Sequence, residues 1–264
     1  SNIFSNPIGM ESFSIMLGAV AFGIQIYCDF SGYSDIAIGA AAIFGFKIPL
    51  NFNKPFFATS PTNYWKRWHI SLSTWVRDYL YFPLAFKHRK SDVVVYSSLM
   101  ISMVLMGLWH GASWNFLIWG GIHGIFLATH TILRRRYSRI TLHPFFQKNI
   151  GKLFSIVITQ YLMFFTFIAF RVKDFDHMLY SMNKYIFVDF ATDKTIEIIM
   201  ENEFAISLMI LFATLHFISF KQGNLAEKIS GIRLRYWVLF LAGIFLPIAL
   251  FYVGSAQEFI YFEF

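Results

Sequence analysis

Six segments of the chain are apolar and contain no Asp, Glu, Lys or Arg. Each has about the length that a helix needs to cross the hydrocarbon core of a bilayer, roughly 20 residues. In lipid only helices and closed barrels satisfy every backbone hydrogen-bonding group, and the alternating pattern of a barrel is absent. The sequence therefore predicts an all-α integral membrane protein in which residues 1–264 form a single membrane domain. The six segments are residues 12–28, 93–109, 111–133, 153–170, 204–220 and 236–255.

Two other segments have apolar positions without the length or the uniformity of a membrane span. Residues 36–46 are apolar but short, and their small side chains predict a re-entrant or tightly packed half-helix. The periodicity of residues 62–86 predicts an amphipathic helix that lies at the membrane interface or dips inward. His69, Ser73 and Arg77 follow one another at intervals of four on its polar side. This polar stripe is either part of a surface anchor or a wall of a reaction chamber.

The charged residues are distributed unequally between the loops. Residues 47–92, 134–152 and 221–235 together hold 18 of the 22 Lys and Arg residues. The loop of residues 171–203 instead has seven acidic against four basic residues. By the positive-inside rule, the three basic loops lie in the cytoplasm and the acidic loop lies outside with the C-terminal tail. The chain starts without Met or a cleavable signal peptide, and we expect it to be the C-terminal part of a longer protein.

Composition supports a membrane protein and limits the possible chemistry. Charged residues make up 14% of the chain, whereas a soluble domain has about 25%. The net charge of +7 does not indicate a nucleic-acid partner, because the basic residues lie in blocks between apolar segments. A single cysteine excludes an internal disulfide and a Cys-based zinc cluster, and the histidines lack the spacing of a metal site. We therefore expect neither a bound metal nor a bound cofactor.

His110 lies where two apolar segments meet, in the sequence Gly-Leu-Trp-His-Gly that contains Trp109 and is followed by Ser113. Burying a histidine there is costly without a partner, and histidine is the side chain best suited to exchanging a proton near neutral pH. The alternative is a core histidine bonded to a backbone carbonyl. A second histidine, His69, follows Trp68 in the sequence Trp-His-Ile-Ser-Leu-Ser beside membrane-like sequence. This pairing favours a catalytic interpretation.

Other ionisable residues lie near the same segments. Asp29 and Asp35 fall between two apolar stretches, where an ionisable side chain is a functional candidate. Alternatively, Asp29 caps the helix that follows and Asp35 pairs with a nearby cation. Lys66 and Arg67 follow a proline-rich loop, residues 49–61, that could hold an anionic group such as the phosphates of acetyl-CoA. Alternatively, these basic residues only set the topology. His123, flanked by glycines, is interpreted as a polar residue in close helix packing.

The motifs around His69 and His110, which lie 41 residues apart, resemble the membrane-bound O-acyltransferase (MBOAT) family. Residues 27–37, Tyr-Cys-Asp-Phe-Ser-Gly-Tyr-Ser-Asp-Ile-Ala, and residues 259–264, Phe-Ile-Tyr-Phe-Glu-Phe, are similar to its bacterial branch. That branch O-acetylates alginate and other exported polysaccharides. The resemblance implies the C-terminal part of an MBOAT fold, with about six transmembrane helices plus re-entrant and interfacial helices.

The resemblance also implies a reaction, the transfer of an acyl group, in the first place acetyl, from a cytoplasmic thioester such as acetyl-CoA to an acceptor hydroxyl. It makes His110 the general base, a role that contributes about 10²–10⁴-fold, and gives His69 a supporting role. It further implies the bacterial cytoplasmic membrane and an extracytoplasmic acetyltransferase partner or a polysaccharide acceptor. Supporting or channel-lining positions are Trp68, Ser73, Arg77, Asp78, Trp109, Ser113, Asp29 and Asp35, and donor-binding positions are Lys66 and Arg67.

Several alternatives remain open from the sequence. Within the family, the acyl group could be D-alanyl or a fatty acyl chain. In a transporter without covalent chemistry, Asp29, Asp35 and His110 would form an ion or proton pathway. A literal topology also separates His69 from His110 by most of the bilayer, about 30 Å. The two share a chamber only if the helix of residues 62–86 dips inward, or if the segment of residues 93–109 is short and the protein is hollowed from outside.

Overall fold

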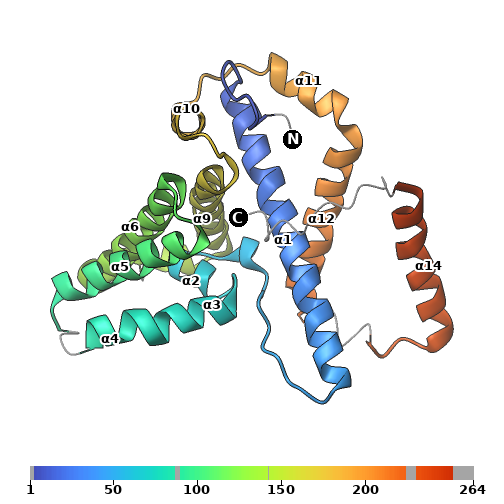
Figure 1. Ribbon diagram of the computed structural model, residues 1–264, viewed down its shortest axis with the longest axis horizontal. Helices are drawn as coiled ribbons and strands as arrows, with labels where there is room; N and C mark the ends of the chain where they lie inside the picture. The colour runs from blue at the N-terminus through green and yellow to red at the C-terminus, as the bar shows by residue number, and fades with distance from the viewer. Residues whose placement is uncertain (1–2, 87–89, 142, 224–229, 252–264) are drawn as a thin grey trace.

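The computed structural model describes residues 3–86, 90–141, 143–223 and 230–251, and every regular element within these residues is helical (Figure 1). Helix α14 (Leu234–Phe251) covers most of the sixth predicted span, residues 236–255. Residues 252–255 of that span lie outside the described part. The predicted all-α membrane fold is confirmed. Within the described residues, five helices are long and apolar enough to cross a membrane: α1 (Ser12–Ile43), α5 (Asp92–His110), α6 (Trp114–Arg136), α9 (Asn149–Arg171) and α12 (Glu203–Gln222).

Helix α1 is longer than the sequence predicted. Its 32 residues extend for about 48 Å at 1.5 Å per residue, more than the roughly 30 Å of a hydrocarbon core. The prediction of a separate half-helix at residues 36–46 was wrong, because the helix continues through this segment to Ile43. No proline interrupts it, and the alanines near its end favour helix. It ends at Ile43, and Gly45, two residues later, has a positive φ of 81° that suits glycine.

Helices α5 and α6 form a tightly packed antiparallel hairpin. Their backbones approach so closely that a Cβ atom on Gly107 would collide with the carbonyl of Phe116, and one on Gly120 with the carbonyl of Met103. Ser113 caps the start of α6 by accepting a hydrogen bond from the backbone N–H of Phe116 at 3.5 Å. The connection between the helices is therefore short, and His110 lies at its beginning.

The predicted helix over residues 62–86 is broken. The chain forms α2 (Pro61–Trp65), then a break, and then a second helical segment. The left-handed backbone of His69, with φ 42°, interrupts the helix. His69 therefore lies outside the helical segment that carries Ser73 and Arg77. The second segment consists of α3 (Ile70–Trp75), the π-helix η2 (Val76–Tyr81) and α4 (Phe82–Ala85).

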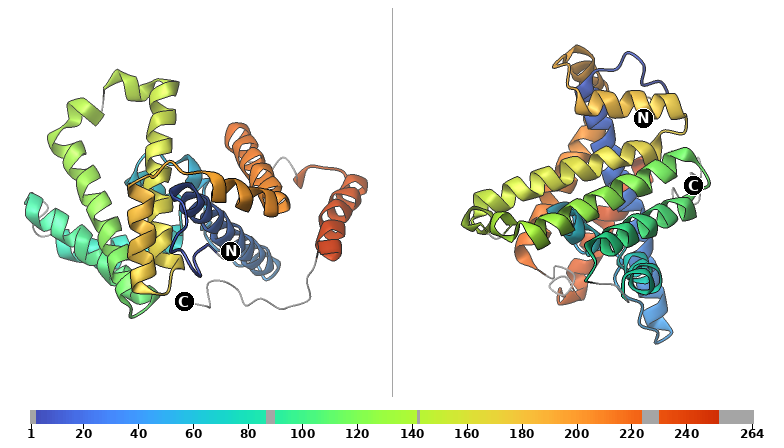
Figure 2. Two further views of the ribbon diagram at one scale, coloured as in Figure 1. Left: turned by 90° about the horizontal axis from the view of Figure 1, so that it is seen from above. Right: turned by 90° about the vertical axis from the view of Figure 1, so that its left-hand side faces the viewer.

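Helix α9 is the central element and packs against α1, α6 and α10 (Phe175–Ile186). Figure 2 shows α5, α6 and α9 running side by side and crossing the direction of α1. The acidic loop of residues 171–203 contains two short helices, α10 and α11 (Asp193–Glu201). Three single-turn helices, η1 (Pro55–Phe57), α7 (Ser138–Thr141) and α8 (Pro144–Gln147), lie in the remaining connections.

Helix α12 is attached to the rest of the protein through the proline-rich loop. Lys54 donates hydrogen bonds from Nζ to the backbone carbonyls of Ser219 at 2.7 Å and Gly223 at 2.6 Å, at the C-terminal end of α12. A cation there satisfies carbonyls that have no partner within the helix. The ring of Phe57 in η1 stacks on His216 of α12 at 5.4 Å. Lys54, a basic residue of the proline-rich loop, therefore helps to hold the end of α12 in place.

Candidate active site

His110 is the last residue of α5, and aromatic rings surround its imidazole. Trp109 precedes it, Trp119 comes from α6 and Phe170 comes from the end of α9, with ring centroids 5.0, 5.3 and 5.1 Å from that of His110. Three helices therefore meet at this side chain, which is half-buried. A ring enclosed in this way is shielded from bulk water and is held in one orientation.

His69 is positioned by the break between α2 and α3. The backbone N–H of Ile70 donates to the carbonyl of Asn51, and that of Asn53 donates to the carbonyl of Arg67, both at 2.9 Å. These two bonds hold the turn that contains His69 against the proline-rich loop. The imidazole packs edge-on against Phe30 of α1, with ring centroids 4.7 Å apart. The polar loop residues thus act in part by shaping the turn that presents this histidine.

The fold brings the two histidines close together although 41 residues separate them. From His69 the chain continues through α3, η2 and α4, and α5 packs along η2 and α4 in the opposite direction, which brings the end of α5 back toward His69 (Figure 1). The pKa of His69 is lowered to about 4, first by burial and second by the charge of His110. His69 is therefore neutral at neutral pH. The influence of His110 on His69 indicates that the two side chains lie near each other, and not at opposite sides of a bilayer.

Trp68 and Trp109 lie on different sides of this region. Trp68 is buried and stacks on Tyr64 at 5.6 Å, with Phe167 of α9 at 5.7 Å on another side. Trp109 is 62% exposed, next to the turn that contains the exposed Ser113. Trp68 therefore belongs to the packed wall behind His69, and Trp109 to the rim beside His110.

Asp29 and Asp35 both lie within α1. Asp29 is half-buried, Asp35 is exposed, and neither is at a helix end, so the interpretation of Asp29 as a helix cap was wrong. The side chain of Ser34, which lies between them, accepts a hydrogen bond from Asn51 Nδ2 at 3.3 Å. This part of α1 therefore faces the loop that shapes the turn of His69.

A cavity of about 430 Å³ lies beside the candidate site, between η2 and the α5–α6 hairpin. Lys66, Ser73 and Arg77 line it together with apolar side chains of α5. Arg77 also forms an ion pair with Asp78 at 2.7 Å, on the exposed side of η2. The interpretation of Ser73 and Arg77 as one polar stripe that faces a chamber is consistent with this cavity, whereas His69 lies off that stripe.

Arg67 is held by the loop. Its Nε donates to Asn63 Oδ1 at 3.0 Å and its Nη1 donates to the carbonyl of Asn53 at 3.1 Å. It therefore supports the turn of His69 at the same time as it offers its remaining donors. Within the described residues, no three His, Cys, Asp or Glu side chains are grouped as metal ligands. The expected absence of a metal stays a prediction.

His123 is closer to the candidate site than the sequence indicated. It is 2% exposed, and its Nδ1 has no hydrogen-bond partner among the described residues. Its ring lies 4.7 Å from that of Trp119, which also contacts His110, and 5.1 Å from that of Trp65. The packing role predicted from its glycines is seen, but its neighbourhood depends on how closely α5 and α6 cross. In the sequence, the only sign that His123 lies near the candidate site is its short separation from His110 across the α5–α6 hairpin.

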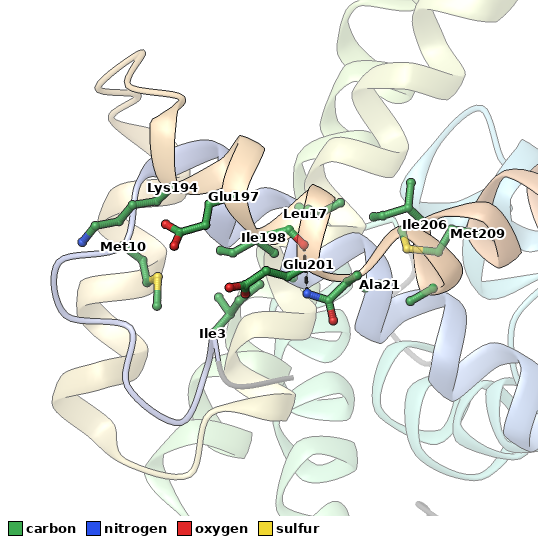
Figure 3. A pocket seen from close by; sticks show the side chains of 13 residues that line it. Ile3, Met10, Leu17, Ala21, Lys194, Glu197, Ile198, Glu201, Ile206 and Met209 are labelled. Atoms are coloured by element: carbon green, nitrogen blue, oxygen red, sulfur yellow. Dashed lines mark hydrogen bonds between the residues drawn. The ribbon is translucent and has the colours of Figure 1, made fainter. Parts of the chain in front are cut away.

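A second cavity, of about 440 Å³, lies between the start of α1 and helices α11 and α12 (Figure 3). Ile3, Met10 and Ile198 are among its apolar lining, and Glu197 and Glu201 add carboxylates from α11. No histidine lines it. This cavity is therefore separate from the candidate site.

Comparison with known proteins agrees with these features. The chain is 50% identical over 128 residues to a probable alginate O-acetylase AlgI of Azotobacter vinelandii, which covers 48% of this chain and 26% of that protein. It is 36% identical over 176 residues to a peptidoglycan O-acetyltransferase of Helicobacter pylori, covering 67% of this chain and 32% of that protein. It is 31% identical over 168 residues to a teichoic acid D-alanyltransferase of Bacillus subtilis, covering 61% and 42%.

The aligned part of the chain thus spans between about a quarter and two fifths of the length of these relatives. A model of the membrane-bound O-acyltransferase family matches residues 6–172. The matched region begins just before α1 and ends with α9, so it includes both histidines and every helix that holds them. The chain belongs to the membrane-bound O-acyltransferase family.

Proposed function

We propose that this chain is the histidine-bearing part of an enzyme that transfers an acetyl group from a thioester to a hydroxyl acceptor. The observation that carries the proposal is the nearness of His69 and His110, each packed against aromatic rings. Family membership and the names of the relatives, which include O-acetylases, support acyl transfer to oxygen.

In this proposal His110 is the general base. An alcohol is a weak nucleophile until its proton is removed as the new C–O bond forms. A ring nitrogen of His110 takes that proton, the acceptor oxygen bonds to the carbonyl carbon of the thioester, and the C–S bond breaks. The thiolate that leaves then recovers the proton from the imidazolium. The donor, acetyl-CoA or another acyl thioester, is a substrate and not a resident cofactor.

His69 has the properties of a hydrogen-bonding group in the same proposal. Because its pKa is lowered to about 4, it stays neutral at neutral pH and avoids placing a second positive charge beside a protonated His110. A neutral imidazole can donate one hydrogen bond and accept another. It is suited to orienting the acceptor hydroxyl or the thioester, with Ser73, Arg77 and Lys66 lining the adjacent cavity.

The wider assignment follows the relatives. The acceptor would be an exported cell-envelope polysaccharide or an extracytoplasmic acetyltransferase partner that modifies it, and the protein would lie in the bacterial cytoplasmic membrane. Identity of 50% to an alginate O-acetylase, against 31% to a teichoic acid D-alanyltransferase, favours acetyl over D-alanyl transfer. Supplying membranes with radiolabelled acetyl or D-alanyl thioester and comparing incorporation distinguishes these two.

The test of the base uses the full-length protein in membranes. His110→Gln keeps the size and some hydrogen bonding of the side chain but cannot take the proton. Acetyl transfer, normalised to the amount of folded protein, should fall by about 10²-fold or more. His143→Gln, at an exposed histidine that caps α8, is the matched control and should keep its activity. Near-normal transfer by His110→Gln would refute its role as the base, and thioester-independent function would favour a transporter.

A further inference from the structure

The largest of the three cavities described lies far from His110. It has a volume of about 840 Å³ and is enclosed by the second half of α6, by α8 and by the first half of α9. His110 contacts the opposite ends of the same two helices, through Trp119 of α6 and Phe170 of α9. From Trp119 to Arg134 along α6 is about 22 Å at 1.5 Å per residue. This cavity therefore lies toward the opposite end of α6 from His110.

The cavity is positively charged at one end. Arg134 opens the run Arg134-Arg135-Arg136, but its two neighbours are already bound, since Arg135 and Arg136 hold Asp92 at 3.0 and 2.8 Å. Arg134 instead lines the cavity, as does Lys152 at the start of α9. No Asp or Glu is among the described lining residues, and neither cation has a carboxylate partner in the described part of the chain. Two unpaired cations in one cavity favour an anion as its occupant.

Away from these cations the cavity becomes apolar. Phe126 lies eight residues before Arg134 on α6, and Leu162 lies ten residues after Lys152 on α9, so the apolar wall reaches about 12 to 15 Å inward. This depth matches one leaflet of a hydrocarbon core about 30 Å thick. Ile158 on this wall is 43% exposed and Ile125 is 54% exposed, so the cavity is open sideways, toward lipid. A solute that arrives from water would not need such an opening.

We propose that this cavity binds an anionic phospholipid from the adjacent leaflet. Its phosphate lies between Arg134 and Lys152, and an acyl chain lies along Phe126, Ile158 and Leu162. The cavity also reaches His130, whose Nδ1 hydrogen-bonds Thr62 of α2 at 2.8 Å. A lipid held here therefore packs against the short helix that leads to His69, and it joins α6, α9 and α2. This proposal is independent of the chemistry at His110.

The experiment uses the full-length protein exchanged into vesicles of phosphatidylcholine that contain phosphatidylglycerol, with bound lipid counted by native mass spectrometry after extraction. In the test variant, Arg134→Gln and Lys152→Gln are combined. Retained phosphatidylglycerol should fall roughly 25-fold, since each of the two cations near an anionic headgroup contributes about fivefold. The matched control combines Arg139→Gln with Lys148→Gln, which removes the same charge from the same exposed loop outside the cavity. It should lose little.

A second variant tests the apolar wall with the charges intact. Ile158→Trp fills the cavity and should also reduce retained phosphatidylglycerol, while leaving the elution volume of the protein unchanged. Equal losses in the test and control pairs would show that loop charge alone attracts lipid and would overturn the proposal. No loss in any variant would show that another part of the full-length protein fills the cavity. Displacement of the lipid by coenzyme A would assign the cavity to a water-soluble phosphate instead.

Discussion

His69 presents its ring from a backbone conformation that residues with a Cβ rarely adopt, with φ 42° and ψ 56°. The left-handed region costs such residues on the order of 1 kcal/mol. The hydrogen bonds of Ile70 to Asn51 and of Asn53 to Arg67 hold both sides of the turn and so stabilise this conformation. Glycine would fit the backbone better. A histidine at this position is therefore best explained by what its side chain does.

This reasoning gives a graded prediction for three substitutions of His69. His69→Asn should retain more acetyl transfer than His69→Ala, because asparagine tolerates the left-handed region and keeps a hydrogen-bonding side chain. His69→Gly relieves the backbone but removes the side chain, so it should be about as inactive as His69→Ala. Transfer is measured in membranes and normalised to folded protein. A glycine variant more active than the asparagine variant would show that only the backbone turn matters.

At the scale of elements, hydrophobic patterning predicted the membrane helices well because a span must be apolar over its whole length. The patterning ended the first predicted span before Asp29, whereas α1 continues past both Asp29 and Asp35. Apolar length does not mark the end of such a helix, because a long helix can continue beyond the hydrocarbon core. The break at His69 was not predictable, because hydrogen bonds between residues 14 and 19 positions apart impose it. Periodicity reports only which positions are apolar.

The candidate site, like the helices, could be predicted only in part from the sequence. The motifs around His69 and His110 could be found in the sequence because they resemble a family. That they meet depends on the antiparallel course of α3 to α5, which no local pattern encodes. The position of His123 beside Trp119 depends on how closely two glycine-containing helix surfaces cross. Contacts between distant segments are thus where sequence reasoning alone was insufficient.

The α5–α6 crossing offers a matched test of how helix packing positions His110. A Cβ atom on Gly120 would collide with the Met103 carbonyl, whereas one on the adjacent Gly121 would meet nothing within 4 Å. Gly120→Ala should force the helices apart and shift His110, lowering both acetyl transfer and the melting temperature in detergent. Overpacking of this kind costs about 1–3 kcal/mol. Gly121→Ala should leave both quantities near those of the unmodified protein, and equal effects of the two would contradict a role for close packing.

At the scale of the whole molecule, the two ends of the helix bundle have different charges. Residues 134–152, from the end of α6 to the start of α9, carry six basic residues and no acid: the run of three arginines, Arg139, Lys148 and Lys152. At the other end, the segment of residues 171–203, which contains α10 and α11, has seven acidic against four basic residues. It is tied to the start of α1, where Glu11 accepts hydrogen bonds from the backbone of Lys194 and Thr195. Because α9 spans 23 residues, about 35 Å separates these two ends.

This separation makes the topology testable with two cysteine labels in full-length protein, in a Cys28→Ser background without other accessible thiols. Ser138→Cys reports on the basic end, and Asp176→Cys reports on the acidic end from an exposed position of α10. Asp189 is less suitable, because it pairs with Lys184 at 2.7 Å and holds the start of α1.

Since basic loops stay in the cytoplasm, a membrane-impermeant maleimide added to intact cells should label Asp176→Cys but not Ser138→Cys. Permeabilised cells should label both. Labelling of Ser138→Cys alone in intact cells would invert the topology, and His110 would then lie toward the cytoplasm, on the side of the thioester rather than of the exported acceptor.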